Sequence, residues 1–220
     1  MENIKISISS KIKEVAPSLR VGVIQAQVEV AEKSESLWTE IDQYVDDFSL
    51  EMPELAKMSQ ISEARKVYRA LGKDPTRYRL SSDSLMRRIV KGQGLYQVNN
   101  IVDLNNLLSL QSGHSIGTYD SDKISGSVTY DVGTAEDVYV GIGRGNLNID
   151  GLPVFKDDIG CFGSATSDSE RSMVTENTKT ILMNIIAFDG DDKLQKWMDE
   201  ATRLLEIHAG GHDFKYSIVC

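Results

Sequence analysis

The 220-residue sequence predicts an α/β protein of the α+β kind, whose sheet mixes parallel and antiparallel strand pairs. Short segments with alternating or β-branched apolar residues lie near both ends of the chain. Longer segments carry apolar residues at helical spacing, and glycine, proline and asparagine mark the boundaries between segments. Hydrophobic residues make up 40% of the chain, so we expect it to bury a substantial core.

The first third of the chain predicts two strands and then helices. Residues 4–9 alternate apolar and polar side chains, and residues 19–30 form a more apolar run, so both are expected to be strands. Residues 32–48 and 60–72 carry apolar residues at helical spacing, with Gly72 placed to end the second helix. Pro75 disfavours helix before it, and Ser81 or Ser82 is the expected N-cap of a third helix that ends near Val90.

The remainder predicts further strands and two helices. An apolar helix is expected from the asparagine pair at 99–100 to Gly113. Residues 127–132 and 137–142 are expected to form an antiparallel strand pair, and residues 178–188 a central strand. Residues 191–211 predict a long helix and residues 214–219 a final strand. We expect a single domain over 1–220, helix-rich to about residue 92, with the motif-bearing core from about 93 onward.

Composition limits the location and the chemistry of the protein. No run approaches the roughly 18 apolar residues of a membrane span, and the N-terminus lacks the features of a secretory signal, so we expect a cytoplasmic protein without a membrane partner. The three histidines and two cysteines lack the spacing of a metal site, and the glycines of 141–146 lack the residues of a phosphate-binding loop. We therefore expect no metal and no cofactor.

One basic segment interrupts an acidic chain. The net charge is −9, yet residues 65–91 contain nine basic and two acidic residues. Two interpretations stay open: these residues contact RNA, or they cover helix surfaces and pair with nearby carboxylates. The arginines that would contact RNA are Arg65, Arg69, Arg77, Arg79, Arg87 and Arg88.

Several polar residues accompany the apolar helix expected after residue 98. Helical spacing places Asn99, Asp103 and Asn106 on one face, with Asn100 beside them. These side chains either cap the helix and bond to neighbouring backbone, or form the polar wall of a pocket for a substrate ammonium or hydroxyl group.

Residues 97–126 carry a family resemblance. VNNIVDLNNLLSLQSGHSIGTYDSDKISG resembles the B3/B4 module of the bacterial phenylalanyl-tRNA synthetase β subunit, in which a V-N-x-V-V-D-x-x-N helix leads to a glycine, an aromatic-Asp pair and a D-K/R-I-x-G turn. IGCFGSATSDSERSMVTENTKTILMNIIAF resembles the module's G-x-F-G segment, Ser/Asp loop and next core strand. YRALGKDPTRYRLSSDSLMRR is similar to the version of the domain that occurs as a separate protein.

The resemblance implies an editing function. The module hydrolyses tRNA mischarged with tyrosine, so the expected partners are tRNA or aminoacyl-tRNA, with the amino acid in the pocket, and not DNA. The implied pocket contains Asn99, Asn100, Asp103, Asn106, Gly117, Tyr119, Asp120, Gly163, Ser164 and Asn184. Gly117 and Asn184 stand where the family's histidine and glutamate are expected, which leaves tyrosine specificity and hydrolysis open.

Three functions are consistent with these features. The first is a trans-acting hydrolase that deacylates a mischarged aminoacyl-tRNA. The second is a non-catalytic module that binds RNA or an amino acid, and the third is an unrelated small-molecule enzyme on the same fold. The proofreading interpretation depends on an open cavity, sized for an aminoacyl group, between the asparagine-bearing helix and residues 160–164.

Overall fold

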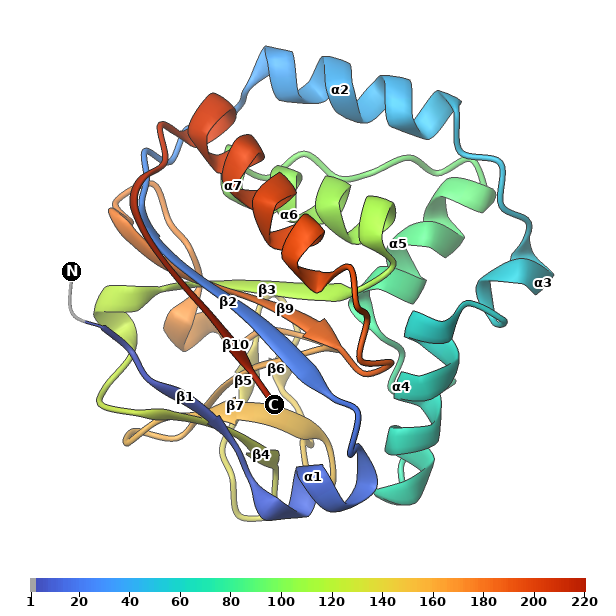
Figure 1. Cartoon of the computed structure of the whole chain (residues 1–220), viewed down its shortest axis with the longest axis vertical. Coiled ribbons are helices and arrows are strands. Elements are labelled where there is room, and N and C mark those ends of the chain that lie inside the picture. The colour runs from blue at the N-terminus through green and yellow to red at the C-terminus, as the bar shows by residue number, and fades with distance from the viewer. Residues whose placement is uncertain (1–2) are drawn as a thin grey trace.

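The computed structural model describes residues 3–220, and within that range the longer strands form two sheets (Figure 1). The first, here called the central sheet, pairs its neighbours antiparallel in the order β10 (His212–Val219), β2 (Arg20–Gln27), β9 (Thr180–Ala187) and β3 (Ser115–Asp120). The second, here called the outer sheet, has the order β1 (Ile6–Ile8), β4 (Val128–Val132), β7 (Pro153–Lys156) and β8 (Cys161–Ser164). Only its β1–β4 pair is parallel.

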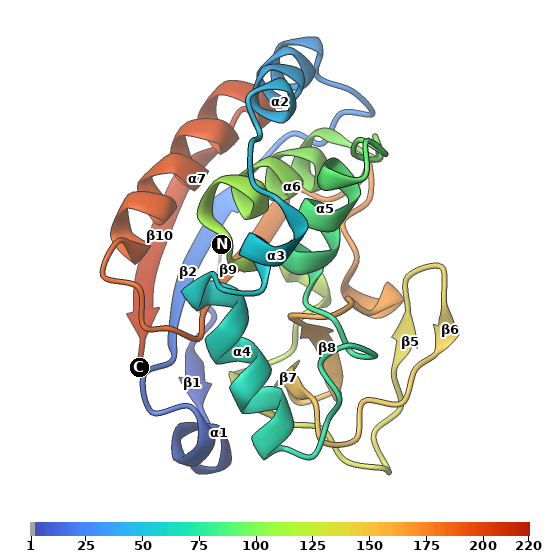
Figure 2. The same ribbon diagram turned by 90° about the vertical axis from the view of Figure 1, so that its right-hand side faces the viewer.

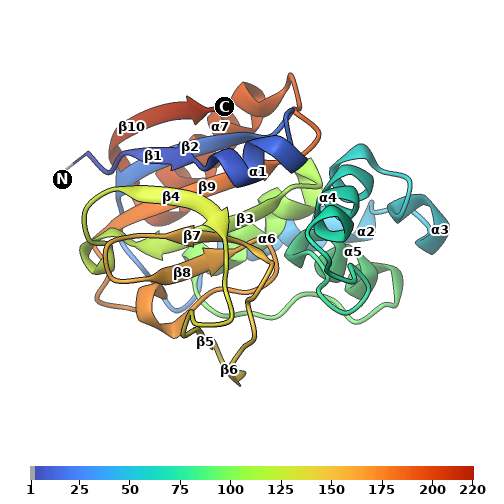
Figure 3. The ribbon, with the colours of Figure 1, turned by 90° about the horizontal axis from the view of Figure 1, so that it is seen from below.

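Helices cover one face of the central sheet. α6 (Asn100–Ser112) and α7 (Leu194–Ala209) pack on that face, and α2 (Glu35–Asp46) lies over them (Figure 1). The apolar side chains of β9 on this side, including Met183 and Ile185, pack against leucines of both helices. The layers are therefore helices, central sheet and outer sheet, from top to bottom in Figure 1, and in the view from below the outer sheet lies nearest the viewer (Figure 3).

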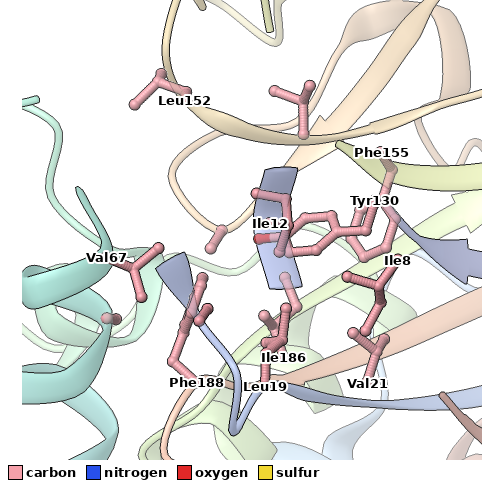
Figure 4. Packing of buried hydrophobic residues seen from close by; sticks show 14 of the residues in the cluster. Ile8, Ile12, Leu19, Val21, Val67, Tyr130, Leu152, Phe155, Ile186 and Phe188 are labelled. Atoms are coloured by element: carbon pink, nitrogen blue, oxygen red, sulfur yellow. The ribbon is translucent and has the colours of Figure 1, made fainter. Parts of the chain in front are cut away.

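A second apolar core fills the space between the two sheets. Val21 and Ile186 of the central sheet face Tyr130 and Phe155 of the outer sheet (Figure 4). α1 (Ser10–Val15) and α4 (Ser59–Ala70) close two sides of this core, with Ile12 and Val67 among their contributions. Each layer of the fold thus contributes side chains to at least one of these two cores.

A smaller apolar cluster joins the remaining helices. α3 (Met52–Leu55) and α5 (Ser81–Val90) contribute Leu55, Met86 and Ile89, which pack with Leu110 of α6. The link between α4 and α5 runs beside β8 (Figure 2). Within residues 3–220 no helix combines the length and the apolar character that crossing a bilayer requires.

The fold class predicted from the sequence is confirmed, and so are the helices at α2, α4, α5, α6 and α7 and the central strand β9. The strand pair expected between residues 127–132 and 137–142 is wrong. β4 pairs with β1 and β7, while the later segment contains only β5 (Val140–Gly141), which pairs with β6 (Gly145–Asn146). The physical reason is burial, because β7 brings Val154 and Phe155 to the core whereas Val138 is 80% exposed.

The expected N-cap of α5 is also wrong. Leu80 holds the cap position, and Ser81 and Ser82 lie inside the helix. The backbone N–H of Ser81 donates to the carbonyl oxygen of Ala165, 2.8 Å away. A loop carbonyl therefore satisfies the free amide that a cap side chain would otherwise bind.

Asn100 fixes the first turn of α6 to two other parts of the fold. Its Oδ1 accepts from the backbone N–H of Ala31 at 2.9 Å, and its Nδ2 donates to the carbonyl oxygens of Glu29 at 2.9 Å and His208 at 2.8 Å. The side chain is buried. It therefore ties α6 to the chain after β2 and to the end of α7.

We predict that Asn100→Ala lowers the free energy of unfolding by about 2–4 kcal/mol, because three hydrogen bonds are lost and buried backbone groups are left unpaired. Urea unfolding followed by circular dichroism measures the change. Asn106→Ala on the same helix is the control, since the Asn106 side chain has no hydrogen-bond partner in the described part of the chain, and we expect it to shift stability by about 0.5 kcal/mol or less. Equal losses of stability in the two variants would contradict the role of the Asn100 side chain in tying α6 to the chain after β2 and to the end of α7.

Candidate functional site

The open cavity expected between the asparagine-bearing helix and residues 160–164 is wrong, because α6 packs on one face of the central sheet and β8 lies in the outer sheet on the other face. The ring of Tyr119 fills the space between Gly117 of β3 and Gly163 of β8, two residues of the implied pocket. Tyr119 is buried, and its hydroxyl lies between two glycines. A Cβ atom placed on Gly117 would lie 2.1 Å from this hydroxyl, and one placed on Gly163 would lie 2.2 Å from it. Both positions therefore accept only glycine while the ring is present.

Several contacts hold this ring in place. The Tyr119 hydroxyl donates to Oδ1 of Asp168 at 2.9 Å. The ring meets Phe162 edge-on at a centroid distance of 5.0 Å and Phe155 at 6.2 Å. A hydrogen bond to a charged group and two aromatic contacts together contribute about 2–6 kcal/mol before burial of the ring is counted. The side chain is thus firmly fixed.

The Asp168 carboxyl group has a pKa above the ordinary value of an aspartate. Burial raises the pKa of Asp168 to about 6, although hydrogen bonds from the Tyr119 hydroxyl and from the backbone N–H of Ser164 lower it. Burial also raises the pKa of Tyr119 well above its ordinary value, and the nearby Asp168 carboxylate adds to that rise. Tyr119 is therefore the proton donor of the pair.

Tyrosine hydroxyls also hold the loop of residues 164–169. The Tyr68 hydroxyl bonds to Oγ1 of Thr166 at 2.8 Å, and the Tyr139 hydroxyl donates to the carbonyl oxygen of Ser167 at 2.6 Å. Ser164 Oγ accepts from the backbone N–H groups of Thr166 and Ser167 and donates to the Ser167 carbonyl oxygen. Because these bonds occupy the Ser164 hydroxyl, it serves the loop conformation.

A cavity of about 260 Å³ lies on the solvent side of this loop. We call it the outer cavity. Ser164, Thr166, Ser167 and Tyr139 line it on the loop side, and Arg77, Tyr78 and Arg144 also line it. Arg77 and Tyr78 come from the link between α4 and α5, whereas Arg144 lies in the turn between β5 and β6 (Figure 2). The outer cavity thus brings two cations and two tyrosines to the Ser164 loop.

An unpaired amide lies in the core next to the Tyr119 ring. Asn184 of β9 stands opposite Gly117 of β3 and Val23 of β2, and shares the inter-sheet face with Leu182 and Ile186. It is fully buried, and neither amide atom has a hydrogen-bond partner among residues 3–220. An unpaired buried polar group costs about 1–3 kcal/mol, so this residue does not serve stability.

The basic segment of α4, α5 and their link divides into two groups. Arg65 and Arg87 each lie 2.7 Å from the Asp83 carboxylate, and Arg79 lies 3.6 Å from it. Asp83 is buried, so these three arginines pair with a carboxylate, which is the second of the two interpretations of the basic segment. Arg88 stacks on the Tyr96 ring, with the guanidinium carbon 3.8 Å from the ring centroid.

Arg69 and Arg77 form the second group, because both are exposed. Arg77 lies 5.6 Å from the centroid of the Tyr78 ring and lines the outer cavity. Of the six arginines predicted to contact RNA, Arg77 is therefore the one that the fold brings next to a residue of the implied pocket, Ser164.

A model of the B3/4 domain family matches residues 63–209, which is more than half of the chain. The chain belongs to the B3/4 domain family. Its fold is similar to an N-terminal fragment of the phenylalanyl-tRNA synthetase beta-subunit from Pyrococcus horikoshii, with 14% sequence identity and a TM-score of 0.50. The alignment covers 99% of this chain and 51% of that fragment, so the chain spans about half of its length. No curated protein matches the sequence significantly.

In this protein the motif residues Asn99 and Asp103 form hydrogen bonds that hold the start of α6 in place. Asn99 caps α6, because its Oδ1 accepts from the backbone N–H of Val102 at 2.9 Å. Asp103 accepts from the backbone N–H of Val98 at 2.9 Å and from Trp38 Nε1 at 2.8 Å, and burial raises its pKa. The capping interpretation of these residues is the one that the hydrogen bonds support.

Asp120 and Asn106 also lie apart from the outer cavity. The Asp120 carboxylate accepts from the backbone N–H of Asp122 at 3.1 Å and from Thr178 Oγ1 at 2.9 Å, which fixes the turn after β3. Asn106 lies half-buried on α6. The pocket residues that the fold does gather are Gly117, Tyr119, Gly163, Ser164 and Asn184.

Sequence reasoning missed four residues of the candidate site. Asp168 and Tyr139 hold or flank the Ser164 loop, and Tyr78 and Arg144 line the outer cavity. Asp168 lies in the Ser/Asp loop of the family motif, so its acidic side chain there was the available signal. Tyr78 and Arg144 carry no comparable signal, because only the folded chain brings the α4–α5 link next to the β5–β6 turn.

We predict that Gly163→Ala lowers the free energy of unfolding by about 3 kcal/mol in the natural chain, because the added Cβ collides with the Tyr119 ring. In a Tyr119→Ala background the same change is expected to cost about 1 kcal/mol or less. A double-mutant cycle by urea unfolding measures the coupling. Additive costs would mean that the ring and Gly163 are not in contact.

We predict that Asp83→Ala lowers the free energy of unfolding by about 2–4 kcal/mol, since it leaves Arg65 and Arg87 without their shared carboxylate in a partly buried place. Thermal and urea unfolding measure it. The control is Glu63→Ala, which removes the partner of exposed Lys66 on α4 and is expected to cost about 0.5 kcal/mol or less. A neutral Asp83→Ala variant would contradict the assignment.

Proposed function

We propose that this B3/4 domain protein acts in trans on aminoacyl-tRNA as an editing hydrolase that deacylates a mischarged tRNA. The cavity expected beside the asparagine-bearing helix is not open, so the proposal is carried by a different space, the outer cavity. Arg77, from the basic segment, and Ser164, from the family's pocket motif, line the same cavity, and Asp168 lies directly behind its wall. The similarity of the fold to a fragment of a phenylalanyl-tRNA synthetase beta-subunit agrees with a role connected to tRNA.

The mouth of the outer cavity suits the acceptor end of an RNA. Arg77 and Arg144 supply positive charge for phosphates, and the Tyr78 ring offers a surface on which a base can stack. The chain as a whole carries a charge of −9, so nonspecific attraction of RNA to its other surfaces is weak. Binding would therefore concentrate at this mouth.

We assign Asp168 as general base; it does not itself line the outer cavity, so this role requires a water molecule to reach its carboxylate past Ser164. A water molecule attacks the ester carbonyl carbon and its proton passes to the Asp168 carboxylate. The C–O bond to the terminal ribose then breaks as Asp168 returns that proton to the ribose oxygen, which releases the amino acid and leaves the carboxylate ionised again. A pKa of about 6 leaves the carboxylate ionised at neutral pH while keeping it basic enough to accept a proton. The loop hydrogen bonds from Tyr139 and Tyr68 hold the peptide groups around it in position.

A second function, binding of aminoacyl-tRNA without hydrolysis, is favoured by one observation. Tyr119 occupies the space between Gly117 and Gly163 and engages Oδ1 of Asp168. Asn184 and Gly117 also stand where the resemblance expects a glutamate and a histidine. A site that keeps its shape while losing these groups could retain affinity without turnover.

We predict that the purified protein deacylates at least one member of a panel of mischarged tRNAs, and that Asp168→Asn slows this reaction about 100-fold or more. The rate is expected to fall as the pH drops through about 6, because protonation of Asp168 removes the base. Release of radiolabelled amino acid measures the rate. Asp158→Asn, an exposed carboxylate on the β7–β8 turn, is the control and should keep the natural rate.

A flat panel at high protein concentration would remove the hydrolase and leave binding to be tested. Binding predicts an affinity for aminoacyl-tRNA that falls with salt and with Arg77→Ala or Arg144→Ala. Lys66→Ala, on the exposed surface of α4 and paired with Glu63, should change affinity much less. Affinity that ignores both salt and the two arginines would contradict a site at the outer cavity.

A further inference from the structure

The Tyr119 side chain has surroundings like those that a protein gives to a bound aromatic ligand. Its ring lies against two glycine backbones and beside the stacked rings of Phe155 and Phe162, and its hydroxyl donates to the Asp168 carboxyl group. Glycines where a ring passes, aromatic side walls and one polar partner for the hydroxyl are what a pocket for a phenol requires. The space has the shape of an aryl-binding site, and residue 119 permanently fills it.

We infer that Tyr119, whose ring lies over Gly117 where the family motif has a histidine, is a specificity-determining residue that excludes aromatic aminoacyl groups and restricts the site to aminoacyl groups with small side chains. This inference rests on the proposed function for its substrate class. A substrate is left with the outer cavity of about 260 Å³, which has to hold the ester and part of the terminal ribose as well. An aromatic side chain could be accommodated only if the Tyr119 ring were absent.

Asn184 supports the same inference independently. Its amide is fully buried without a partner among the described residues, and it lies on the inter-sheet face beside Gly117, the residue whose backbone the Tyr119 hydroxyl covers. Removal of the ring would open a space with the Asp168 carboxyl group at one side and the Asn184 amide at another. Such a space offers an acceptor and a donor to a phenolic hydroxyl group.

The space beside Gly117 and Gly163 is closed by the Tyr119 side chain, which needs glycine at residue 117, and not by a mobile lid. The ring belongs to β3, an edge strand of the central sheet, and its residue pairs with Leu182 of β9. Its hydroxyl and both flanking rings are engaged. Substrate size is therefore limited by a fixed side chain.

Binding of phenol tests the filled space without any tRNA. Phenol at millimolar concentration should raise the melting temperature of Tyr119→Ala, and toluene should do so less because it lacks the hydroxyl. The natural protein and Tyr119→Phe, which keeps the ring, should show no shift. If Tyr119→Ala does not fold alone, Tyr119→Leu opens a smaller space and should show the same order of responses. Equal shifts in the natural protein, or no shift in a folded Tyr119→Ala or Tyr119→Leu variant, would overturn the inference.

Deacylation of two substrates tests the substrate class. The natural protein should hydrolyse alanyl-tRNA at least 10-fold faster than tyrosyl-tRNA, and Tyr119→Ala should move this ratio at least 10-fold toward tyrosyl-tRNA. Preference of the natural protein for tyrosyl-tRNA would overturn the inference. If neither protein cleaves any aminoacyl-tRNA, the proposed function fails, and the phenol measurement still decides whether Tyr119 fills an aryl site.

Discussion

The double burial of β9 is the constraint on which the structure depends. This strand pairs with β2 and β3, faces α6 and α7 on one side and faces the outer sheet on the other. A strand in that position is expected to be apolar on both faces. Asn184 is the exception, and it lies in the row that contains Gly117. The candidate site thus lies beside the one buried polar residue of a strand that is otherwise apolar where it is buried, as expected when function overrides local stability.

Buried carboxylates give the helical part of the domain its order. Asp83 collects three arginines from α4, α5 and the link between them, and Asp103 joins the start of α6 to Trp38 of α2. Each carboxylate is satisfied by several donors, which is how a buried charge becomes tolerable. Polar residues that a substrate pocket could have used thus serve the scaffold, and the basic segment presents less free positive charge than its composition suggests.

Periodicity and cap residues were enough to predict most helices and the central strand, because these elements bury one clear stripe or a whole apolar run. β3 was not recognised, since Ser115–Asp120 mixes small and polar residues and becomes a buried strand only through its pairing with β9. The same holds for the site. Gly117, Gly163 and Tyr119 were all expected near one pocket, yet the sequence does not reveal that the tyrosine ring returns over both glycines and closes it. That outcome depends on a side-chain direction and on the distance between two sheets.

The Tyr119 ring would clash with any side chain at residue 117 or 163, and this limits the order in which mutations at the three positions can be tolerated. A mutation that enlarges either glycine is harmful until the tyrosine has been replaced, and loss of the tyrosine leaves a void until a larger residue or a ligand occupies it. The three positions therefore depend on one another in this protein, and changing them one at a time passes through either a void or a steric clash.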